Sequence, residues 1–204
     1  MKLLDFALAP NPKKVRVYLK EKGIEMPIEP VDVMSGQNRT PEFLKTVNPL
    51  GGLPVLVLDD GSHLTESLAM IEYLEETHPA PPMLGTTALE RARVRELERI
   101  CELGALSNIA TVFQNTSPFF AQRVKQSADA ADNARTRLAA SLRVIDAAIG
   151  TKPFACGARP TIADCTLFAA LEFAAFGNVA IDFAALPNLS RWYEAFKQRP
   201  SAQA

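Results

Sequence analysis

The feature that most constrains this chain is a change of sequence pattern at the proline-rich stretch Pro79–Pro82. Before this stretch, short apolar runs alternate with helical patterns, whereas after it only helical periodicity is present. Prolines interrupt both helices and strands, so the stretch is typical of a linker. We therefore expect one domain at residues 1–79, a linker at residues 80–88 and a second domain at residues 89–204.

The first domain alternates strand and helix patterns. Short apolar runs predict strands, and apolar residues three or four positions apart predict helices. The predicted elements are a strand at Leu3–Phe6, a helix after Pro12 that stops at Gly23, a strand at Ile28–Val33, hairpin strands at Pro54–Leu58 and Ser62–Leu64, and a helix at Ser67–Thr77. A strand–helix–strand unit pairs its strands in parallel, and the turn Asp59-Asp60-Gly61 favours a hairpin. This order is that of an α/β thioredoxin-like domain.

The second domain shows helical faces and no convincing strand pattern. Apolar residues that repeat along one helix face are predicted to form core, not to line a ligand. Three such faces are present: Leu138, Leu142, Ile145 and Ile149; Ala163, Leu167, Ala170, Leu171 and Ala174; and Leu189, Trp192, Tyr193 and Phe196. The second domain is therefore predicted to be an all-α helical bundle.

Composition excludes several classes of function. The formal net charge is -1, which gives no reason to expect a nucleic-acid or anionic-membrane partner. No apolar run approaches the roughly 18 residues of a membrane span, and no signal-peptide pattern opens the chain. These features predict a protein of the cytoplasm or another reducing compartment, with no membrane partner.

The three cysteines, Cys101, Cys156 and Cys165, form no C-x-x-C pair and no Cys/His group at zinc spacing. Each lies among apolar or small residues, which is typical of a buried and unreactive thiol. The sequence therefore predicts no metal site.

Four local motifs carry a family resemblance: Asn11–Arg16, Asn48–Leu56, Leu64–Ser67 and Gly157–Asp164. In this order and spacing they resemble the cytosolic glutathione transferases over essentially the whole chain, near the theta and phi classes of the bacterial and fungal branch. The resemblance implies the glutathione transferase fold. It also implies glutathione as co-substrate, no other cofactor, and a homodimer.

The resemblance implies where glutathione binds. Pro54 would follow a cis peptide bond, and the backbone of Leu53 would pair with the cysteinyl part of glutathione, much as an added strand would. Without the resemblance, Pro54 would simply start an edge strand. Glu66 would hold the γ-glutamyl ammonium and Ser67 its carboxylate at a helix N-terminus. Ordinary N-capping is the alternative for this pair.

Two further positions complete the implied glutathione site. Asn38 and Arg39 occupy the loop that approaches the glycine carboxylate in related classes, although an exposed Arg39 without a ligand is the alternative. Gly52 stands where many relatives carry a glutamine or lysine that contacts the peptide. The glycine removes that side-chain donor.

The group that activates the thiol departs from the family pattern. The resemblance places the usual serine at Ala9, which has no donor. Asn11 is the nearest polar substitute, through its amide or through N–H groups at the start of the helix, and a plain turn residue before Pro12 is its alternative. Some relatives recruit groups from the helical domain instead, and Gln114–Ser117 lies in a plausible region for that.

The motif Gly157–Asp164 is expected to be structural. Thr161 and Asp164 have the spacing of a capping box at a helix start.

In the helical domain, an apolar wall for the second substrate is expected from three residues, Phe113, Phe119 and Phe120. The leading hypothesis is an enzyme that directs the glutathione thiolate onto a small hydrophobic electrophile. The alternatives are a glutathione-dependent disulfide reductase or peroxidase, and a non-catalytic binding or scaffold protein on the same fold.

Overall fold

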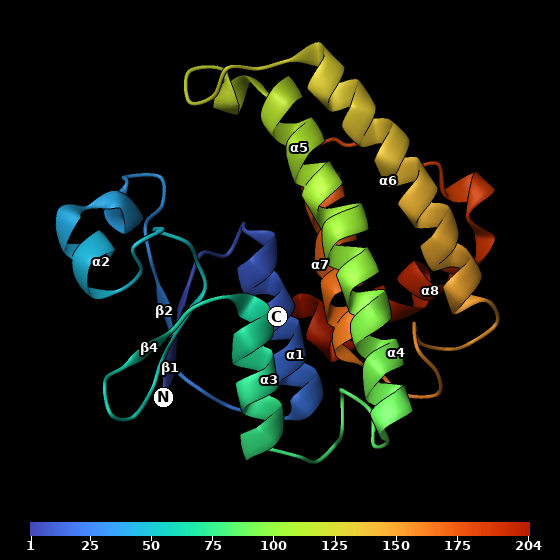
Figure 1. Ribbon diagram of the computed structural model, residues 1–204, viewed down its shortest axis with the longest axis horizontal. Helices are drawn as coiled ribbons and strands as arrows, with labels where there is room; N and C mark the ends of the chain where they lie inside the picture. The colour runs from blue at the N-terminus through green and yellow to red at the C-terminus, as the bar shows by residue number, and fades with distance from the viewer. The chain divides into compact units, whose positions relative to one another are not determined.

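The computed structural model describes residues 1–204, and the chain separates into two compact units (Figure 1). Residues 1–81, with Ala204, form the first unit, and residues 82–203 form the second. The first unit contains a small mixed sheet with helices and the second is helical, which confirms the predicted fold class. The division falls within the proline-rich stretch, while the domain limits at residues 79 and 89 stay predictions.

The first unit is built on a four-stranded sheet of order β2-β1-β3-β4. β1 and β2 pair in parallel, whereas β3 runs antiparallel to both β1 and β4. Its elements are β1 (Lys2–Asp5), α1 (Pro10–Lys22), β2 (Ile28–Pro30), a 3-10 turn (Gln37–Arg39), α2 (Pro41–Thr46), β3 (Val55–Val57), β4 (His63–Leu64) and α3 (Ser67–Thr77). The predicted order of strands and helices is therefore confirmed.

Local chemistry explains where these elements end. α1 stops where Gly23 adopts a left-handed conformation, with φ of 73°, as glycine does at helix ends. β2 is shorter than predicted and ends at Pro30, although the N–H of Val31 still donates to the carbonyl oxygen of Asp5 in β1 at 2.8 Å. The short α2 was not predicted from the sequence, although Thr40 caps it by accepting from the N–H of Phe43.

The core beside the sheet is formed by Leu4, Val31, Phe43 and Val55. Leu53, in the loop that enters β3, packs its side chain against this cluster. This contact anchors the end of the loop that carries the predicted cis peptide bond.

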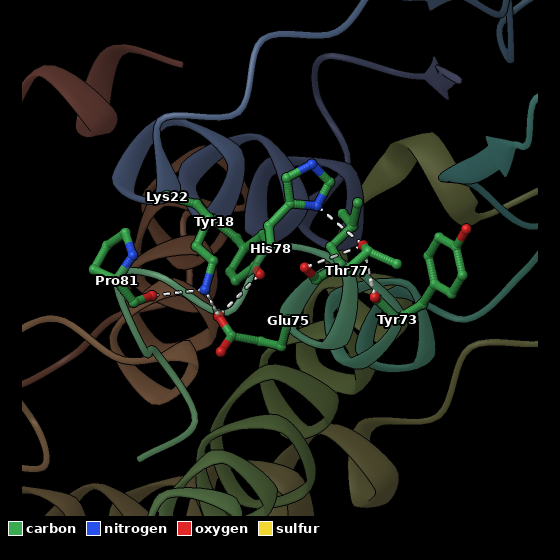
Figure 2. Close-up of polar contacts among 8 residues, drawn as sticks. Tyr18, Lys22, Tyr73, Glu75, Thr77, His78 and Pro81 are labelled. Carbon is green, nitrogen blue, oxygen red and sulfur yellow. Dashed lines mark hydrogen bonds and ion pairs between the residues drawn. The ribbon is translucent and has the colours of Figure 1, made fainter. Parts of the chain in front are cut away.

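A buried polar network joins α1 to α3 (Figure 2). Lys22 Nζ lies 2.5 Å from Glu75 Oε1 and 2.6 Å from the carbonyl oxygen of Pro81, and the Tyr18 hydroxyl donates to the same carboxylate oxygen at 2.9 Å. Both charged side chains are enclosed. Because a buried ion pair is tolerated only when its atoms are satisfied, these contacts lock α3 and the end of the first unit onto α1.

The second unit is helical throughout, apart from one isolated bridge between Phe154 and Gly157. Figure 1 shows α4, a π-helical segment and α5 as one continuous rod, with α6 packed beside it. Its elements are α4 (Ala88–Arg99), the π-helical segment (Ile100–Leu106), α5 (Ser107–Thr116), a 3-10 turn (Pro118–Phe120), α6 (Ala128–Ile149), α7 (Ile162–Phe176), α8 (Pro187–Lys197) and 3-10 turns at Phe183–Ala185 and Pro200–Gln203.

The start of α4 carries a complete capping box between Thr87 and Glu90. The Glu90 carboxylate also accepts from the hydroxyl and N–H of Thr86. These hydrogen bonds, that of the Thr86 hydroxyl foremost, lower the pKa of Glu90 to about 2.

The second capping box, predicted at Thr161 and Asp164, is confirmed at the start of α7. Asp164 Oδ2 accepts from the N–H and the hydroxyl of Thr161, both at 2.8 Å. Its Oδ1 accepts from the N–H of Ala155 at 2.7 Å and from Trp192 Nε1 at 2.9 Å. The carboxylate therefore ties α7, α8 and the preceding loop together, and its complete burial raises its pKa.

The three predicted helix faces are buried, which confirms them as core. Cys101 and Cys165 are also buried as predicted. Cys156 corrects the prediction, because it is only partly buried, in the loop before α7. Desolvation nevertheless raises the pKa of its thiol to about 11, so it stays protonated at neutral pH. None of the helices has the length and apolar character needed to cross a bilayer.

Candidate functional site

The loop that enters β3 has the predicted backbone. The peptide bond between Leu53 and Pro54 is cis. β3 lies between β1 and β4, so Pro54 leads into an interior strand and not into an edge strand. The N–H and C=O of Leu53 make no hydrogen bond within the chain. This backbone pair is therefore available to an extended ligand.

The same loop is held by three side chains that precede it in the sequence. Asn38 Nδ2 donates to the carbonyl oxygen of Gly51 at 2.7 Å, and Arg39 Nη1 donates to that of Leu50 at 2.9 Å. Asn48 Nδ2 donates to that of Gly52 at 2.9 Å. Asn38 is buried and Arg39 exposed, so only Arg39 keeps donors toward solvent. That either side chain contacts a ligand carboxylate stays a prediction.

Gly51 is required by this geometry. Its φ is +60°, and a Cβ added there would lie 2.6 Å from the carbonyl oxygen of Asn38. Gly52 is exposed, and a Cβ added there would meet only the side-chain amide nitrogen of Asn48, at 3.3 Å. The loop therefore approaches the segment around residue 38 as closely as backbone packing allows.

The start of α3 combines a strained backbone with an uncapped first turn. Glu66 has φ of 67° and ψ of 113°, an unusual conformation for a residue other than glycine. No side chain caps α3, and its first turn contains no acidic residue. Ser67, the first helical residue, is buried, and its hydroxyl makes no hydrogen bond in the chain. Ordinary N-capping therefore does not explain this pair, and the strain is of the kind found at functional sites.

The start of α1 leaves one residue free to act as a donor. Ala9 precedes the helix and provides no side-chain cap. Pro10 and Pro12 have no N–H, so Asn11 supplies the only N–H group among the first three helical residues. The Asn11 carboxamide makes no hydrogen bond within the chain, and its Oδ1 is buried without a partner. Arg16 holds the loop before α1, because its guanidinium donates to the carbonyl oxygen of Ala7 and to the carboxylate of Asp5.

The alternative donors at the end of α5 are mostly occupied. Asn115 donates to the carbonyl oxygen of Thr111 and accepts from the N–H of Ser127. The Thr116 hydroxyl donates back to its own helix, and the Ser117 hydroxyl accepts from the N–H of Phe119. Of the polar groups predicted as activators, the side chains of Asn11 and Gln114 make no hydrogen bond within the chain.

The predicted apolar wall is part of a larger aromatic cluster in the helical unit. The ring centroids of Phe113 and Phe120 are 5.2 Å apart, and those of Phe119 and Phe120 are 4.9 Å apart, both edge to face. Phe173 and Phe176 of α7 also pack on Phe113. Phe173 and Phe176 were not predicted to be part of this cluster. The sequence of α7 is apolar along most of its length, so no pattern distinguishes the two phenylalanines at its end from core residues.

Two positional features of the site were missed from sequence: the roles of Asn48 and of the Glu66 backbone. An asparagine before a proline does signal a local side-chain turn, and Asn48 Oδ1 indeed accepts from the N–H of Leu50. Positive φ at a glutamate has no sequence signal. No group of three or more His, Cys, Asp or Glu side chains gathers where a metal ion could be held.

Comparison with known proteins follows the same division of the chain. Residues 3–82 match the family model of the glutathione S-transferase N-terminal domain, and residues 128–195 match that of the C-terminal domain. The chain is 28% identical to glutathione S-transferase 2 of Saccharomyces cerevisiae, covering 100% of this chain and 88% of that protein. It is 30% identical to a maleylacetoacetate isomerase of Pseudomonas aeruginosa, covering 94% and 88%.

A solved structure agrees over nearly the full length. A glutathione S-transferase domain-containing protein of Marinobacter aquaeolei superposes with a TM-score of 0.89 at 31% identity, covering 98% of this chain and 99% of that chain.

Proposed function

Because this chain belongs to the glutathione transferase superfamily, we propose that it directs the thiolate of bound glutathione onto a small hydrophobic electrophile. It is an enzyme of the glutathione transferase type, with glutathione as co-substrate. The binding site proposed here consists of Asn38, Arg39, Gly52, Leu53, Pro54, Glu66 and Ser67.

The observation that carries the proposal is the uncapped start of α3. A helix N-terminus presents unpaired N–H groups and a partial positive charge, which together favour a carboxylate. Ser67 begins α3 with an unused hydroxyl, and the strained Glu66 precedes it. The γ-glutamyl carboxylate would occupy the first turn, and the Glu66 carboxylate would pair with the ammonium. The strain at Glu66 is then explained by ligand binding.

The cysteinyl part of glutathione would pair with the Leu53 backbone. Leu53 offers one donor and one acceptor that the chain itself does not use. An extended peptide satisfies such a pair by strand-like addition. This contact would fix the direction of the tripeptide, and in the proposed pose its sulfur would face the start of α1.

Asn11 is proposed as the catalytic residue. A thiol with the reference pKa near 8.5 is only about 3% ionised at pH 7. A donor at the sulfur lowers this pKa, and each unit corresponds to about 1.36 kcal/mol. Since Pro10 and Pro12 cannot donate, the N–H and carboxamide of Asn11 are the groups that would stabilise the thiolate.

The second substrate is proposed to contact the aromatic cluster, in particular Phe113, Phe119 and Phe120. Phe119 is the most exposed of the three, so it is the ring that an apolar electrophile would meet first. The guanidinium of Arg123 lies over one face of this ring, 4.3 Å from its centroid, so an apolar electrophile would pack on the part of the ring that remains exposed.

One other reaction class has a specific observation in its favour. The relative that is 30% identical over 94% of the chain is a maleylacetoacetate isomerase. In such a reaction the thiolate would add to the substrate and later leave, so that glutathione is regenerated. Disulfide reduction and peroxidase activity would use the same glutathione site with a different acceptor.

The assembly and location proposed are those of the family. We propose a homodimer in which α3 of one subunit contacts α4 of the other, and a cytoplasmic location. Gel filtration with light scattering tests the dimer directly.

Calorimetry with glutathione and turnover assays test the function together. Ser67→Ala is expected to weaken glutathione binding by about tenfold, equivalent to about 1.4 kcal/mol. Ser62→Ala is the matched control, because Ser62 is exposed in the hairpin and bonds only to Asp60. Unchanged affinity in Ser67→Ala would show that the site is misplaced.

Thiol activation is tested separately with a chloronitrobenzene electrophile, a hydroperoxide and a mixed disulfide as acceptors. Asn11→Ala is expected to raise the pKa of bound glutathione and to lower kcat, whereas Ser117→Ala retains activity. Loss of activity in Ser117→Ala with full activity in Asn11→Ala would transfer the catalytic role to the helical unit.

A further inference from the structure

We propose that Asn38, Arg39 and Asn48 are positioning residues that hold the loop before Pro54 in its ligand-binding conformation. Their side-chain donors are called here the carbonyl clamp. The inference rests on the glutathione site proposed above and assigns these side chains a role through Leu53. Asn38 in particular acts through the loop and not on the glycine carboxylate.

The side chains of the carbonyl clamp donate hydrogen bonds to three consecutive backbone carbonyl oxygens, one from each side chain. Arg39 donates to Leu50, Asn38 to Gly51 and Asn48 to Gly52, at 2.9, 2.7 and 2.9 Å. Asn38 is 6% exposed and Asn48 is 5% exposed. The bond from Asn38 is therefore shielded from water, where a hydrogen bond is stronger, and the bond from Asn48 is partly shielded.

The loop has little else to hold it. It contains two consecutive glycines, and β3 begins only at Val55, so no strand pairing orders Leu50–Gly52. Glycine loses the most conformational freedom when it is fixed. Within the loop, only the turn closed by Asn48, through its carbonyl oxygen and its Oδ1, adds support. Without the clamp, the loop would lose conformational entropy each time a ligand binds, and this loss would weaken binding.

The far end of the loop is anchored by Leu53. Its side chain packs against Leu4, Val31, Phe43 and Val55, while its N–H and C=O remain unpaired. Clamp and anchor together therefore fix both ends of the segment that presents this backbone pair.

The clamp also affects charge. Reduced glutathione carries two carboxylates and one ammonium, so its net charge is -1. Three carbonyl oxygens turned toward N–H donors present less negative potential to that anion than three free ones. Asn38 can do little more, because its Nδ2 is already engaged and its Oδ1 is buried.

Binding of glutathione and of γ-glutamylcysteine, the same ligand without its glycine, separates positioning from direct contact. Asn38→Ala is expected to raise the Kd of both ligands by the same factor, about tenfold, or about 1.4 kcal/mol. With an electrophile at saturation, kcat and its pH profile are expected to stay within about twofold of wild type, because the thiol is activated by Asn11 in another segment. KM for glutathione rises with Kd.

Two variants protect the experiment from a folding artefact. Tyr18→Phe removes a hydrogen bond to buried Glu75 in the same unit, so it lowers stability without changing either Kd. Asn48→Asp keeps the acceptor for Leu50 but loses the donor to Gly52, and it is expected to raise both Kd values as Asn38→Ala does. Faster amide hydrogen exchange across residues 50–55 in either clamp variant gives an independent measurement.

The outcomes are distinct. A penalty for Asn38→Ala that disappears with γ-glutamylcysteine would show direct contact with the glycine carboxylate and overturn the inference. Unchanged Kd values in Asn38→Ala and Asn48→Asp, with wild type binding normally, would overturn it while leaving the proposed function intact. No binding of glutathione by wild type would overturn both.

Discussion

Asp164 offers the sharpest prediction about stability. Its carboxylate is fully buried and accepts four hydrogen bonds, two on each oxygen. Replacement by alanine would leave the N–H of Ala155, the N–H and hydroxyl of Thr161 and the indole of Trp192 without that acceptor. A buried donor that loses its partner costs about 1–3 kcal/mol.

The expected loss for Asp164→Ala is about 3–5 kcal/mol, smaller than the sum of four such terms because the variant also avoids burying a charge. Asp164→Asn keeps Oδ1 as acceptor for Ala155 and Trp192 and loses the acceptor for the Thr161 N–H. Its expected cost is therefore lower, about 1–3 kcal/mol.

Urea unfolding at pH 7 provides the assay. Trp192 is the single tryptophan of the chain, so its fluorescence reports the surroundings of Asp164, and far-ultraviolet circular dichroism supplies a second probe. Asp132→Ala is the matched control, because Asp132 is exposed on α6 and pairs only with Arg135 at the surface; it should cost less than about 1 kcal/mol. A loss below about 1 kcal/mol for Asp164→Ala would refute the reasoning from buried donors.

Three further predictions concern other parts of the fold. The pKa of Glu90 is lowered to about 2 from 4.5, so its stabilising effect is present above pH 4.5 and is lost as the pH falls toward 2. The difference in urea midpoint between wild type and Glu90→Ala should therefore disappear over that pH range. A difference that persists at the acid end would contradict this prediction. Lys22→Ala removes the buried ion pair between Lys22 and Glu75 and should cost about 3–5 kcal/mol in thermal or urea unfolding, while the double variant with Glu75→Leu should cost less than the single one. Gly51→Ala forces a left-handed backbone on alanine and places its Cβ 2.6 Å from a carbonyl oxygen, so it should lower stability by more than about 1 kcal/mol, and an unchanged melting temperature would argue against this packing.

Most of the fold could be predicted because its signals are local. The helix at Ser67–Thr77 has the predicted bounds, and the hairpin forms around Asp59-Asp60-Gly61. α2 was missed because its six residues are too few for a periodic pattern. The π-helical segment Ile100–Leu106 was not predicted either; within it a Cβ on Gly104 would lie 2.6 Å from the Ser141 hydroxyl of α6, a close contact that no local pattern signals.

The candidate site was less predictable than the fold. Motifs indicated the backbone that would face a ligand, including the cis bond before Pro54. They did not indicate which side chains hold that backbone: Asn38 reaches the loop from 13 residues away, and the bond from Asn48 to Gly52 depends on the path of the loop itself. The strain at Glu66 likewise depends on the path of the chain between β4 and α3, and no residue type signals it.

The paired prolines that open α1 have a consequence for how such an enzyme could diversify. In the site proposed above Pro10 and Pro12 cannot donate, so the acidity of a bound sulfur would depend on what Asn11 offers. An exchange of Asn11 for a serine, cysteine or tyrosine would change the donor group offered to the sulfur, while Pro10 and Pro12 would keep the start of the helix in place. Chemistry at this junction can therefore vary one residue at a time, without a new scaffold.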